Sequence, residues 1–192
     1  MKNLFVLAIL IFSVMSCCPC RKAQTPSAVG AGTPASTDVE INAGAGPLSA
    51  TLLVPAGEGP FPGIVIVAGS GPTDRDGNNS FLKGKMNYLK DTAERLAKGG
   101  YASLRYDKRG VGKTPAGDKP PDRDVFVSDC RAAFEFLAGQ PRIDPKRVAL
   151  LGHSEGGLVA ILASKEVKAA SLILVSTAGR PILKIFEDQV RA

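Results

Sequence analysis

The segment Gly152-His153-Ser154-Glu155-Gly156 places a serine between two glycines, each two residues away from it. An apolar, β-type run precedes this segment and a helical run follows it, so Ser154 is expected at a sharp strand-to-helix turn. A serine hydroxyl is a poor nucleophile at neutral pH unless it is exposed and lies close to a base. The following helix adds the positive end of its dipole, which favours negative charge on the reacting oxygen. The pattern therefore predicts nucleophilic acyl transfer by Ser154, in preference to a merely structural glycine-rich turn.

Acyl transfer also requires hydrogen-bond donors for the oxyanion of the tetrahedral intermediate. One donor is expected from the backbone N–H of Glu155, the residue after the nucleophile. The second is expected from the loop Gly69-Ser70-Gly71-Pro72, where the backbone N–H of Ser70 is the best candidate. Small residues in this loop would let the main chain approach a substrate closely. An ordinary tight turn is the alternative interpretation of the same loop.

A base for Ser154 is harder to find, because His153 is the only histidine among the 192 residues. The residue before the serine in such a turn is directed away from it, so His153 is not expected to reach the Ser154 hydroxyl. The apolar run at 171–175 is followed by Ser176–Arg180, which contains no carboxylate. We therefore expect the base and its orienting acid beyond residue 192, and near-background catalysis from the 192 residues alone.

The elements that must position these residues can be read from the apolar pattern. Continuous apolar runs bounded by turn residues predict strands that are buried on both faces, as in a parallel sheet. The runs are Gly63–Ala68, Tyr101–Tyr106, Val148–Leu151 and Ser171–Val175, and two earlier strands are expected around Val39 and Ile41 and over Leu48–Val54.

Helical periodicity fills the intervals between these strands. Apolar residues at i, i+3, i+4, i+7 and i+8 predict a helix over 89–97, which Gly99-Gly100 ends. A similar spacing predicts a second helix over 126–137, with Asp122 or Asp124 as its N-cap. Cys130 falls on the apolar stripe of that helix, which favours a buried core thiol over a reactive one.

A third helix is expected after Ser154 and a fourth from about Pro181. Strands that alternate with helices form βαβ units. The predicted fold class is therefore α/β: a mostly parallel sheet with helices on both faces.

Three segments resemble those of the α/β-hydrolases, and in particular the bacterial esterase and serine aminopeptidase-like group. They are Ala68–Asn78 (AGSGPTDRDGN), Arg105–Thr114 (RYDKRGVGKT) and Gly152–Gly157 (GHSEGG), in the order usual for that group. The resemblance implies an α/β-hydrolase fold that is incomplete at the C-terminus, with an acid and then a histidine still to follow. Proteins of the group usually carry a histidine where this sequence has Ala68. That histidine is generally structural, so its absence affects the hydrogen bonding of the loop more than the chemistry.

Two other motifs suggest nucleotide binding, but each lacks a required residue. Gly112-Lys113-Thr114 resembles the end of a P-loop, yet Asp107 stands where that motif needs glycine, and Pro115 where its helix would begin. Gly69-Ser70-Gly71 has Asp74 where a dinucleotide fingerprint needs its third glycine.

Metal binding and nucleic-acid binding also find little support. Cys17, Cys18 and Cys20 lack a second pair of ligands, so no metal site is predicted. Asp74-Arg75-Asp76 would suit a metal ion or another ligand, although a loop-stabilising ion pair is the favoured interpretation. The formal net charge is +6, but basic and acidic residues are interleaved and tryptophan is absent, unlike the basic stripe of a nucleic-acid binder.

The N-terminus has the pattern of a signal peptide over residues 1–16: a lysine, an apolar run and small residues. The apolar run, Leu4–Met15, is shorter than the ~20 residues that a membrane-spanning helix needs. Val14–Cys17 resembles a bacterial lipobox, although Met15 is not the usual small residue, and it makes Cys17 the expected lipidation site. An exported, membrane-anchored lipoprotein is therefore predicted. A periplasmic or secreted protein, or a retained or wrongly assigned start, is the alternative.

The remaining chain divides into two parts. Residues 17–37 are rich in Pro, Ala, Gly, Ser and Thr and are expected to form a flexible tether. Residues 38–192 are expected to form the N-terminal part of an α/β-hydrolase domain.

The function that these features predict is cleavage of small-molecule carboxylic esters through an acyl-enzyme on Ser154, with no cofactor. A peptidase or a thioesterase would use the same route, so both are alternatives. A third alternative is a non-catalytic lipoprotein that binds a ligand in the same crevice. The only membrane contact expected is through the N-terminal lipid.

Overall fold

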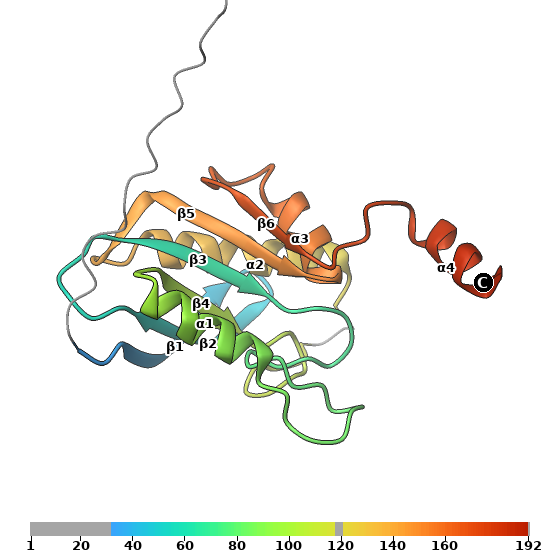
Figure 1. The fold of residues 1–192 in the computed structure, drawn as a ribbon, viewed down its shortest axis with the longest axis horizontal. Coiled ribbons are helices and arrows are strands. Elements are labelled where there is room, and N and C mark those ends of the chain that lie inside the picture. The colour runs from blue at the N-terminus through green and yellow to red at the C-terminus, as the bar shows by residue number, and fades with distance from the viewer. Residues whose placement is uncertain (1–31, 118–120, 192) are drawn as a thin grey trace, which may run out of the picture.

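The computed structural model describes residues 32–117 and 121–191 of the chain. Six strands form one sheet in the order β1-β2-β4-β3-β5-β6 (Figure 1). The strands are β1 (Ala35–Ala43), β2 (Gly46–Val54), β3 (Phe61–Val67), β4 (Ala102–Tyr106), β5 (Ile143–His153) and β6 (Leu172–Val175). The helices are α1 (Tyr88–Lys98), α2 (Arg123–Ala138), α3 (Glu155–Ala163) and α4 (Ile182–Arg191).

The centre of the sheet is parallel, as the continuous apolar runs predict. β3 pairs in parallel with β4 on one side and with β5 on the other, and β6 pairs in parallel with the far side of β5. β1 and β2 add an antiparallel edge, since β1 pairs with β2 and β2 with β4 in antiparallel register. All residues of β3 and β4 are buried. The predicted α/β fold with a mostly parallel sheet is therefore confirmed.

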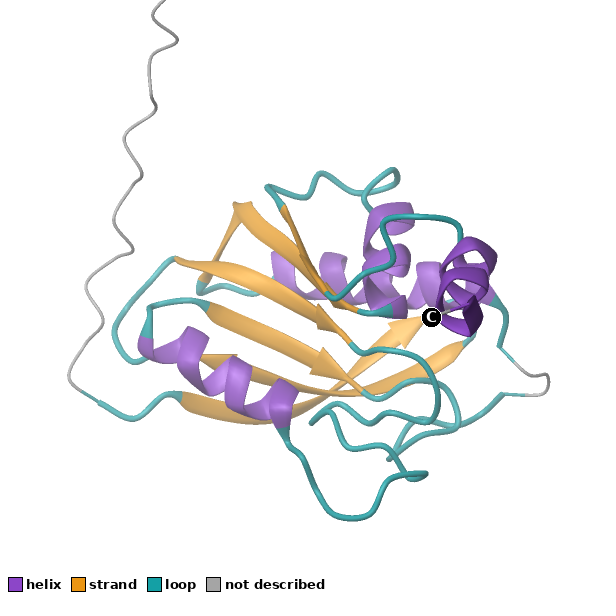
Figure 2. Ribbon diagram, turned by 45° about the vertical axis from the view of Figure 1, so that its right-hand side comes forward, coloured by secondary structure: helices purple, strands orange, loops and turns teal. Residues whose placement is uncertain are grey.

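Helices cover both faces of this sheet, and alternate residues of β3 contribute to the two layers. Val65 and Val67 belong to the apolar cluster that includes α2 and α3, for example Phe134 of α2. Ile64 and Ile66 belong to the second cluster, which contains the buried face of α1. This follows from the two-residue period of a strand. Figure 2 shows the sheet between α1 on one side and α2 and α3 on the other.

The helix ends are set by the residues that the sequence indicated. Gly99 donates from its backbone N–H to the carbonyls of Arg95 and Leu96, and Gly100 then takes a positive φ of 83° that ends α1. The side chain of Asp122 accepts a hydrogen bond from the backbone N–H of Val125, so Asp122 is the N-cap of α2.

Two strand boundaries differ from the sequence prediction. β1 begins at Ala35, inside the segment assigned to the tether, because residues 35–37 pair with 52–54 of β2. This pairing uses backbone groups and needs no apolar side chains, so composition gave no signal. β5 begins at Ile143 rather than Val148: Ile143 pairs with Phe61, and the register of the pair shifts before Gly63.

The helix layers do not extend over the last strand that the structure describes. All four side chains of β6 are exposed. α4 lies apart from the sheet, at the end of the segment that follows β6 (Figure 1). Its first residue, Ile182, agrees with the helix expected from about Pro181.

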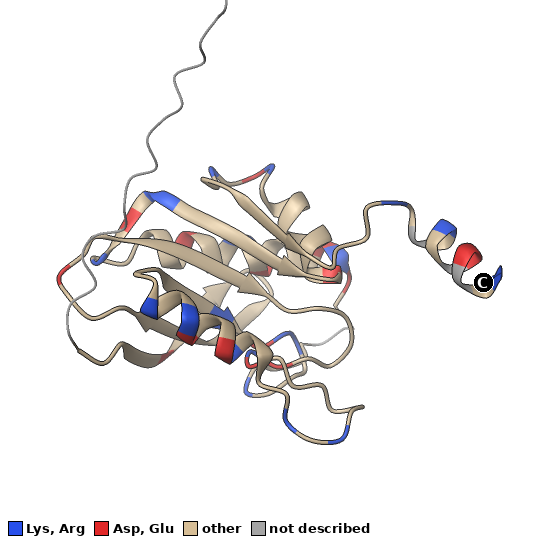
Figure 3. Cartoon of the chain, viewed as in Figure 1, with Lys and Arg blue, Asp and Glu red and all other residues tan. Residues whose placement is uncertain are grey.

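The N-terminal predictions lie largely outside the described residues. These are the signal peptide over 1–16, lipidation of Cys17 and the tether up to residue 31, and they stay predictions. In residues 32–117 and 121–191, no helix is long and apolar enough to span a membrane. Figure 3 shows both basic and acidic residues along α1, in keeping with the mixed charge of the sequence.

Candidate active site

Ser154 forms the turn between a strand and a helix. β5 ends at His153 and α3 begins at Glu155. The backbone of Ser154 has φ 53° and ψ −119°, which a residue with a Cβ rarely adopts. The turn is held on both sides, because Ser154 N–H donates to Val175 O at 2.8 Å and Gly157 N–H donates to Ser154 O at 3.0 Å. The half-buried serine is thus held at a sharp bend.

Glycines around this turn let α3 approach the sheet more closely than side chains would permit. A Cβ on Gly152 would collide with the backbone of Gly156 and a Cβ on Gly156 with the carbonyl of Val67. A Cβ on Gly157 would collide with the side chain of Thr177. The glycine spacing of the motif is therefore a packing requirement in this chain.

Ser154 opens onto a crevice of ≈ 220 Å³ at the carboxyl ends of β3 and β5. Ligands of open α/β sheets bind at this edge. The crevice is lined by Gly69, Ser70, Thr73, Gly77, Asn79, Leu82, Met86, Tyr88, His153 and Ser154. Leu82 and Met86 are each 57% exposed, so they give the crevice an apolar rim.

The two backbone groups expected as oxyanion donors border the serine. Glu155 N–H belongs to the first residue of α3, where a helix offers it no partner. Ser70 lines the crevice, and the adjacent Gly69 is so close to the turn that a Cβ on it would lie 3.4 Å from Ser154 Cβ. Within the described part of the chain, neither Ser70 N–H nor Glu155 N–H donates a hydrogen bond. Neither group is therefore committed to a partner within the described residues.

The side chain of His153 contacts Tyr88. Its Nδ1 lies 3.2 Å from the Tyr88 hydroxyl, and the ring centroids are 5.0 Å apart in an edge-on arrangement. Partial burial, and then the charge of Asp74, raise the pKa of the Tyr88 phenol. Among the described residues no hydrogen bond joins His153 to Ser154, so this histidine belongs to the crevice wall.

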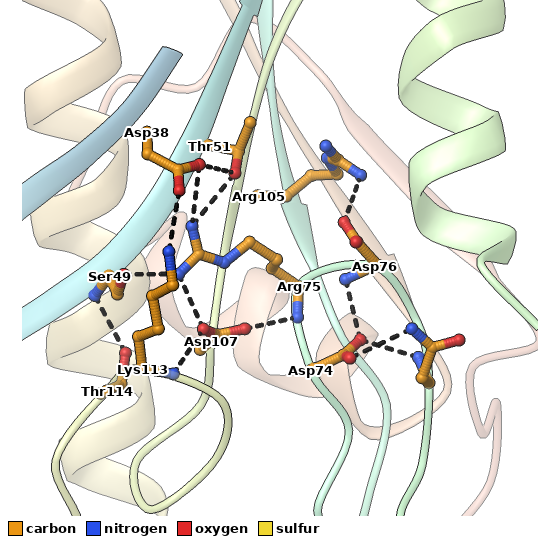
Figure 4. Close-up of polar contacts among 11 residues, drawn as sticks. Asp38, Ser49, Thr51, Asp74, Arg75, Asp76, Arg105, Asp107, Lys113 and Thr114 are labelled. Carbon is orange, nitrogen blue, oxygen red and sulfur yellow. Dashed lines mark hydrogen bonds and ion pairs between the residues drawn. The ribbon is translucent and has the colours of Figure 1, made fainter. Parts of the chain in front are cut away.

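The segment Asp74-Arg75-Asp76 forms ion pairs with β4 and with the residue that follows it. Arg75 Nη2 lies 2.7 Å from Asp107 Oδ2, and the backbone N–H of Arg75 donates to Asp107 Oδ1 at 2.8 Å (Figure 4). Asp76 pairs with Arg105 at 2.8 Å. In the ranges that the structure describes, no three His, Cys, Asp or Glu side chains are grouped to hold a metal ion. The observed contacts agree with the loop-stabilising interpretation.

Asp107 also explains why Gly112-Lys113-Thr114 does not form a phosphate-binding loop. Its Oδ2 accepts the backbone N–H of Lys113 at 2.9 Å, and a Cβ on Gly112 would collide with the carboxylate. A negative group thus occupies the inside of the turn, where a P-loop presents N–H groups to an anion. Burial raises the pKa of Asp107, but hydrogen bonds from Arg75 and Lys113 outweigh it and hold the pKa below its ordinary value.

The sequence motifs did not indicate two cations, Lys108 and Arg109, that connect the segment after β4 to neighbouring elements. Lys108 Nζ donates to Gly69 O at 3.0 Å and lies 3.1 Å from Glu155 Oε2. Arg109 forms a buried ion pair with Asp129 at 2.7 Å. Their position shortly after the buried strand β4 could have indicated these contacts, because charged residues at a buried position need partners.

Together, the parallel sheet with helices on both faces and the serine at a strand-to-helix turn define an α/β-hydrolase. A family profile described as "Serine aminopeptidase, S33" matches residues 83–191. The chain belongs to this family.

Named relatives agree with this membership. Esterase EstD of Thermotoga maritima is 32% identical over 155 residues, which cover 80% of this chain and 35% of EstD. Human acyl-coenzyme A thioesterase 6 is 33% identical over 114 residues, 59% of this chain and 23% of that protein. The α/β-hydrolase GrgF from Penicillium sp. superposes with a TM-score of 0.62 at 24% identity, over 82% of this chain and 53% of GrgF. The chain thus spans about a third of EstD and about half of GrgF.

Proposed function

We propose that this hydrolase cleaves carboxylic esters through an acyl-enzyme on Ser154. The observation that carries the proposal is the backbone of Ser154, held at a positive φ of 53° beside a crevice. Strain of this kind persists only where the surrounding structure enforces it, and it is typical of functional sites. The free N–H groups of Ser70 and Glu155 beside the serine add to this support.

In the proposed reaction, Ser154 Oγ forms a bond to the ester carbonyl carbon while its proton passes to a base. The carbonyl oxygen becomes an oxyanion, which accepts hydrogen bonds from the N–H groups of Ser70 and Glu155. Collapse of this intermediate breaks the ester C–O bond, and the alcohol leaves with the proton returned by the base. A water molecule then hydrolyses the acyl-enzyme by the same steps.

The base and its orienting acid are proposed to lie outside residues 1–192. His153, the only histidine of the sequence, contacts Tyr88 and makes no hydrogen bond to Ser154 within the described residues. The chain matches 35% of the length of EstD, which leaves most of such a relative without a counterpart here. Experiments on catalysis therefore need the full-length gene product.

The substrate is proposed to be a small molecule with an apolar part. Leu82, Met86 and the Tyr88 ring line the crevice beside Ser154 and suit an apolar acyl or alcohol group. The named thioesterase relative makes a thioester the second candidate. Comparing p-nitrophenyl esters, acyl thioesters and aminoacyl amides would rank the three classes by kcat/KM, and faster turnover of amides or thioesters than of esters would contradict the ester proposal.

Labelling with a fluorophosphonate tests the nucleophile. The reagent should form an adduct that mass spectrometry maps to Ser154, because only an activated serine displaces the fluoride. Ser154→Ala should abolish both the adduct and ester hydrolysis, with a loss of at least about 10³-fold in kcat. Exposed Ser70 is the matched control: Ser70→Ala keeps its backbone N–H and should still be labelled. A folded full-length protein that does not react at Ser154 would refute the proposal.

A further inference from the structure

Among the hydrogen bonds of the described residues, only those of the Lys108 side chain reach both segments that carry the proposed oxyanion donors. Lys108 lies two residues after the last residue of β4, Tyr106, and its Nζ reaches Gly69 O at 3.0 Å in the loop after β3. The same Nζ lies 3.1 Å from Glu155 Oε2 at the start of α3. The Lys108 side chain is only 11% exposed, whereas the Glu155 side chain is 43% exposed, so the contact with Gly69 is the better shielded of the two.

The contact with Gly69 fixes the direction of the Ser70 N–H. Gly69 O and Ser70 N belong to the same peptide unit, which is planar and trans. In a trans peptide the C=O and N–H point in opposite directions. Because Lys108 binds the carbonyl at one edge of this peptide unit, the N–H at the opposite edge points away from Lys108. Ser70 itself lines the crevice.

The loop has a second fixed point on the far side of Ser70. Thr73 Oγ1 donates to Ser70 O at 3.0 Å, which orients the next peptide unit. This bond is local and lies within the loop. The bond from Lys108 spans 39 residues, so it joins the loop after β3 to the segment that follows β4.

The contact with the Glu155 carboxylate also links Lys108 to the residue whose N–H is the second proposed donor. Glu155 carries its N–H at the first turn of α3, and its carboxylate is 43% exposed. The Phe126 ring of α2 lies 4.8 Å from Lys108 Nζ and restricts where the ammonium can move. Lys108 is thus held between three elements.

We propose that Lys108 is a positioning residue that holds the Ser70 and Glu155 N–H groups in one arrangement for the oxyanion. The proposal rests on the function proposed above. It places no chemistry on Lys108 itself, because its ammonium contacts Gly69 O and the Glu155 carboxylate and not the reacting atoms.

Lys108→Met in the full-length protein tests the proposal, since methionine keeps an unbranched side chain but donates no hydrogen bond. Loss of one oxyanion donor costs about 10²–10³-fold in kcat, and loss of its positioning should cost less, about 10–100-fold. KM for a p-nitrophenyl ester should change less than about threefold, because the ground-state carbonyl needs these donors little. Lys108→Arg should recover part of the lost kcat.

Lys113→Met is the matched control. Lys113 comes from the same segment and also pairs with a carboxylate, Asp38 at 3.1 Å, but its side chain is 73% exposed and lies outside the crevice. Its kcat should be unchanged. Affinity for a boronic acid, which forms a tetrahedral adduct on a serine, should fall with kcat in Lys108→Met and not in Lys113→Met.

Glu155→Ala keeps the backbone donor and removes an exposed carboxylate, so it tests the second contact even if Lys108→Met does not fold. Glu155→Ala alone should lower kcat about threefold. The double variant with Lys108→Met should have the same kcat as Lys108→Met alone, because Glu155 acts through Lys108. The positioning role would be overturned if the losses of kcat in the two single variants added up in the double variant, or if either single variant kept the wild-type kcat. It would also be overturned if only KM changed. A wild-type protein that is not labelled at Ser154 would instead refute the underlying function.

Discussion

The strained backbone of Ser154 links its chemistry to the stability of the fold. Its φ of 53° and ψ of −119° are accessible to glycine and cost about 1–3 kcal/mol for a residue with a Cβ. Ser154→Gly should therefore unfold at higher urea than Ser154→Ala, with a free energy of unfolding about 1 kcal/mol larger despite the greater flexibility of unfolded glycine. Both variants lack the nucleophile, so alanine is the matched control. Equal midpoints would mean that the turn stores no strain.

At this scale the sequence predicted the strand-to-helix turn at Ser154 better than the contacts around it. Ser154 was identifiable because its motif is local and its glycines meet at one turn. Lys108 was not, because its partners Gly69 and Glu155 are 39 and 47 residues away. Likewise the contact of Tyr88 with His153 depends on how α1 packs against β5. Pairings of this kind come from the fold and leave no short-range pattern.

The loops after β3 and β4 behave as one polar unit around Asp107. Hydrogen bonds from Arg75 and Lys113 outweigh burial and lower the pKa of this carboxyl in the folded state. Asp107 therefore stabilises the fold above its unfolded pKa of about 3.9, and this contribution is lost as the pH falls through the lower folded value. Burial raises the pKa of Asp129, which acts in the opposite direction.

Asp107→Asn isolates this contribution. It should lower the free energy of unfolding at pH 7 by about 3 kcal/mol, because Arg75 is left buried with a weaker partner. The loss should shrink as the pH is lowered from about 5 to 3, and urea unfolding at each pH would measure it. The exposed Asp124 is the control, since Asp124→Asn should change little at any pH. A loss independent of pH would show that the charge of Asp107 contributes nothing.

Among whole elements, the helices and strands were predictable, and the starts of β1 and β5 were not. Burial on both faces leaves continuous apolar runs, as in β3 and β4, and one-sided burial leaves the helical spacing of α1 and α2. β1 begins with Ala35, Ser36 and Thr37, all exposed, and its pairing with β2 is made by the backbone. Composition alone assigned these residues to the tether.

The whole molecule combines two apolar layers that share one sheet. β3 contributes Val65 to one layer and Ile64 to the other, so loosening either layer exposes residues next to the other. Cooperative unfolding as a single unit is expected of such an arrangement. The accessibility of Cys130 reports on this unfolding, because Cys130 lies fully buried in α2 within the larger layer.

Labelling of Cys130 by iodoacetamide should therefore follow global unfolding. Burial, and then the charge of Asp129, raise the pKa of its thiol to about 12, so almost no thiolate is present in the folded state at pH 8. Mass spectrometry separates the peptide with Cys130 from Cys17, Cys18 and Cys20, and the denatured protein gives the intrinsic rate. The rate should rise with urea at the midpoint seen by circular dichroism. Labelling well below that midpoint would show that α2 detaches from the sheet on its own, because an opening confined to one layer would expose Cys130 while α1 stays packed.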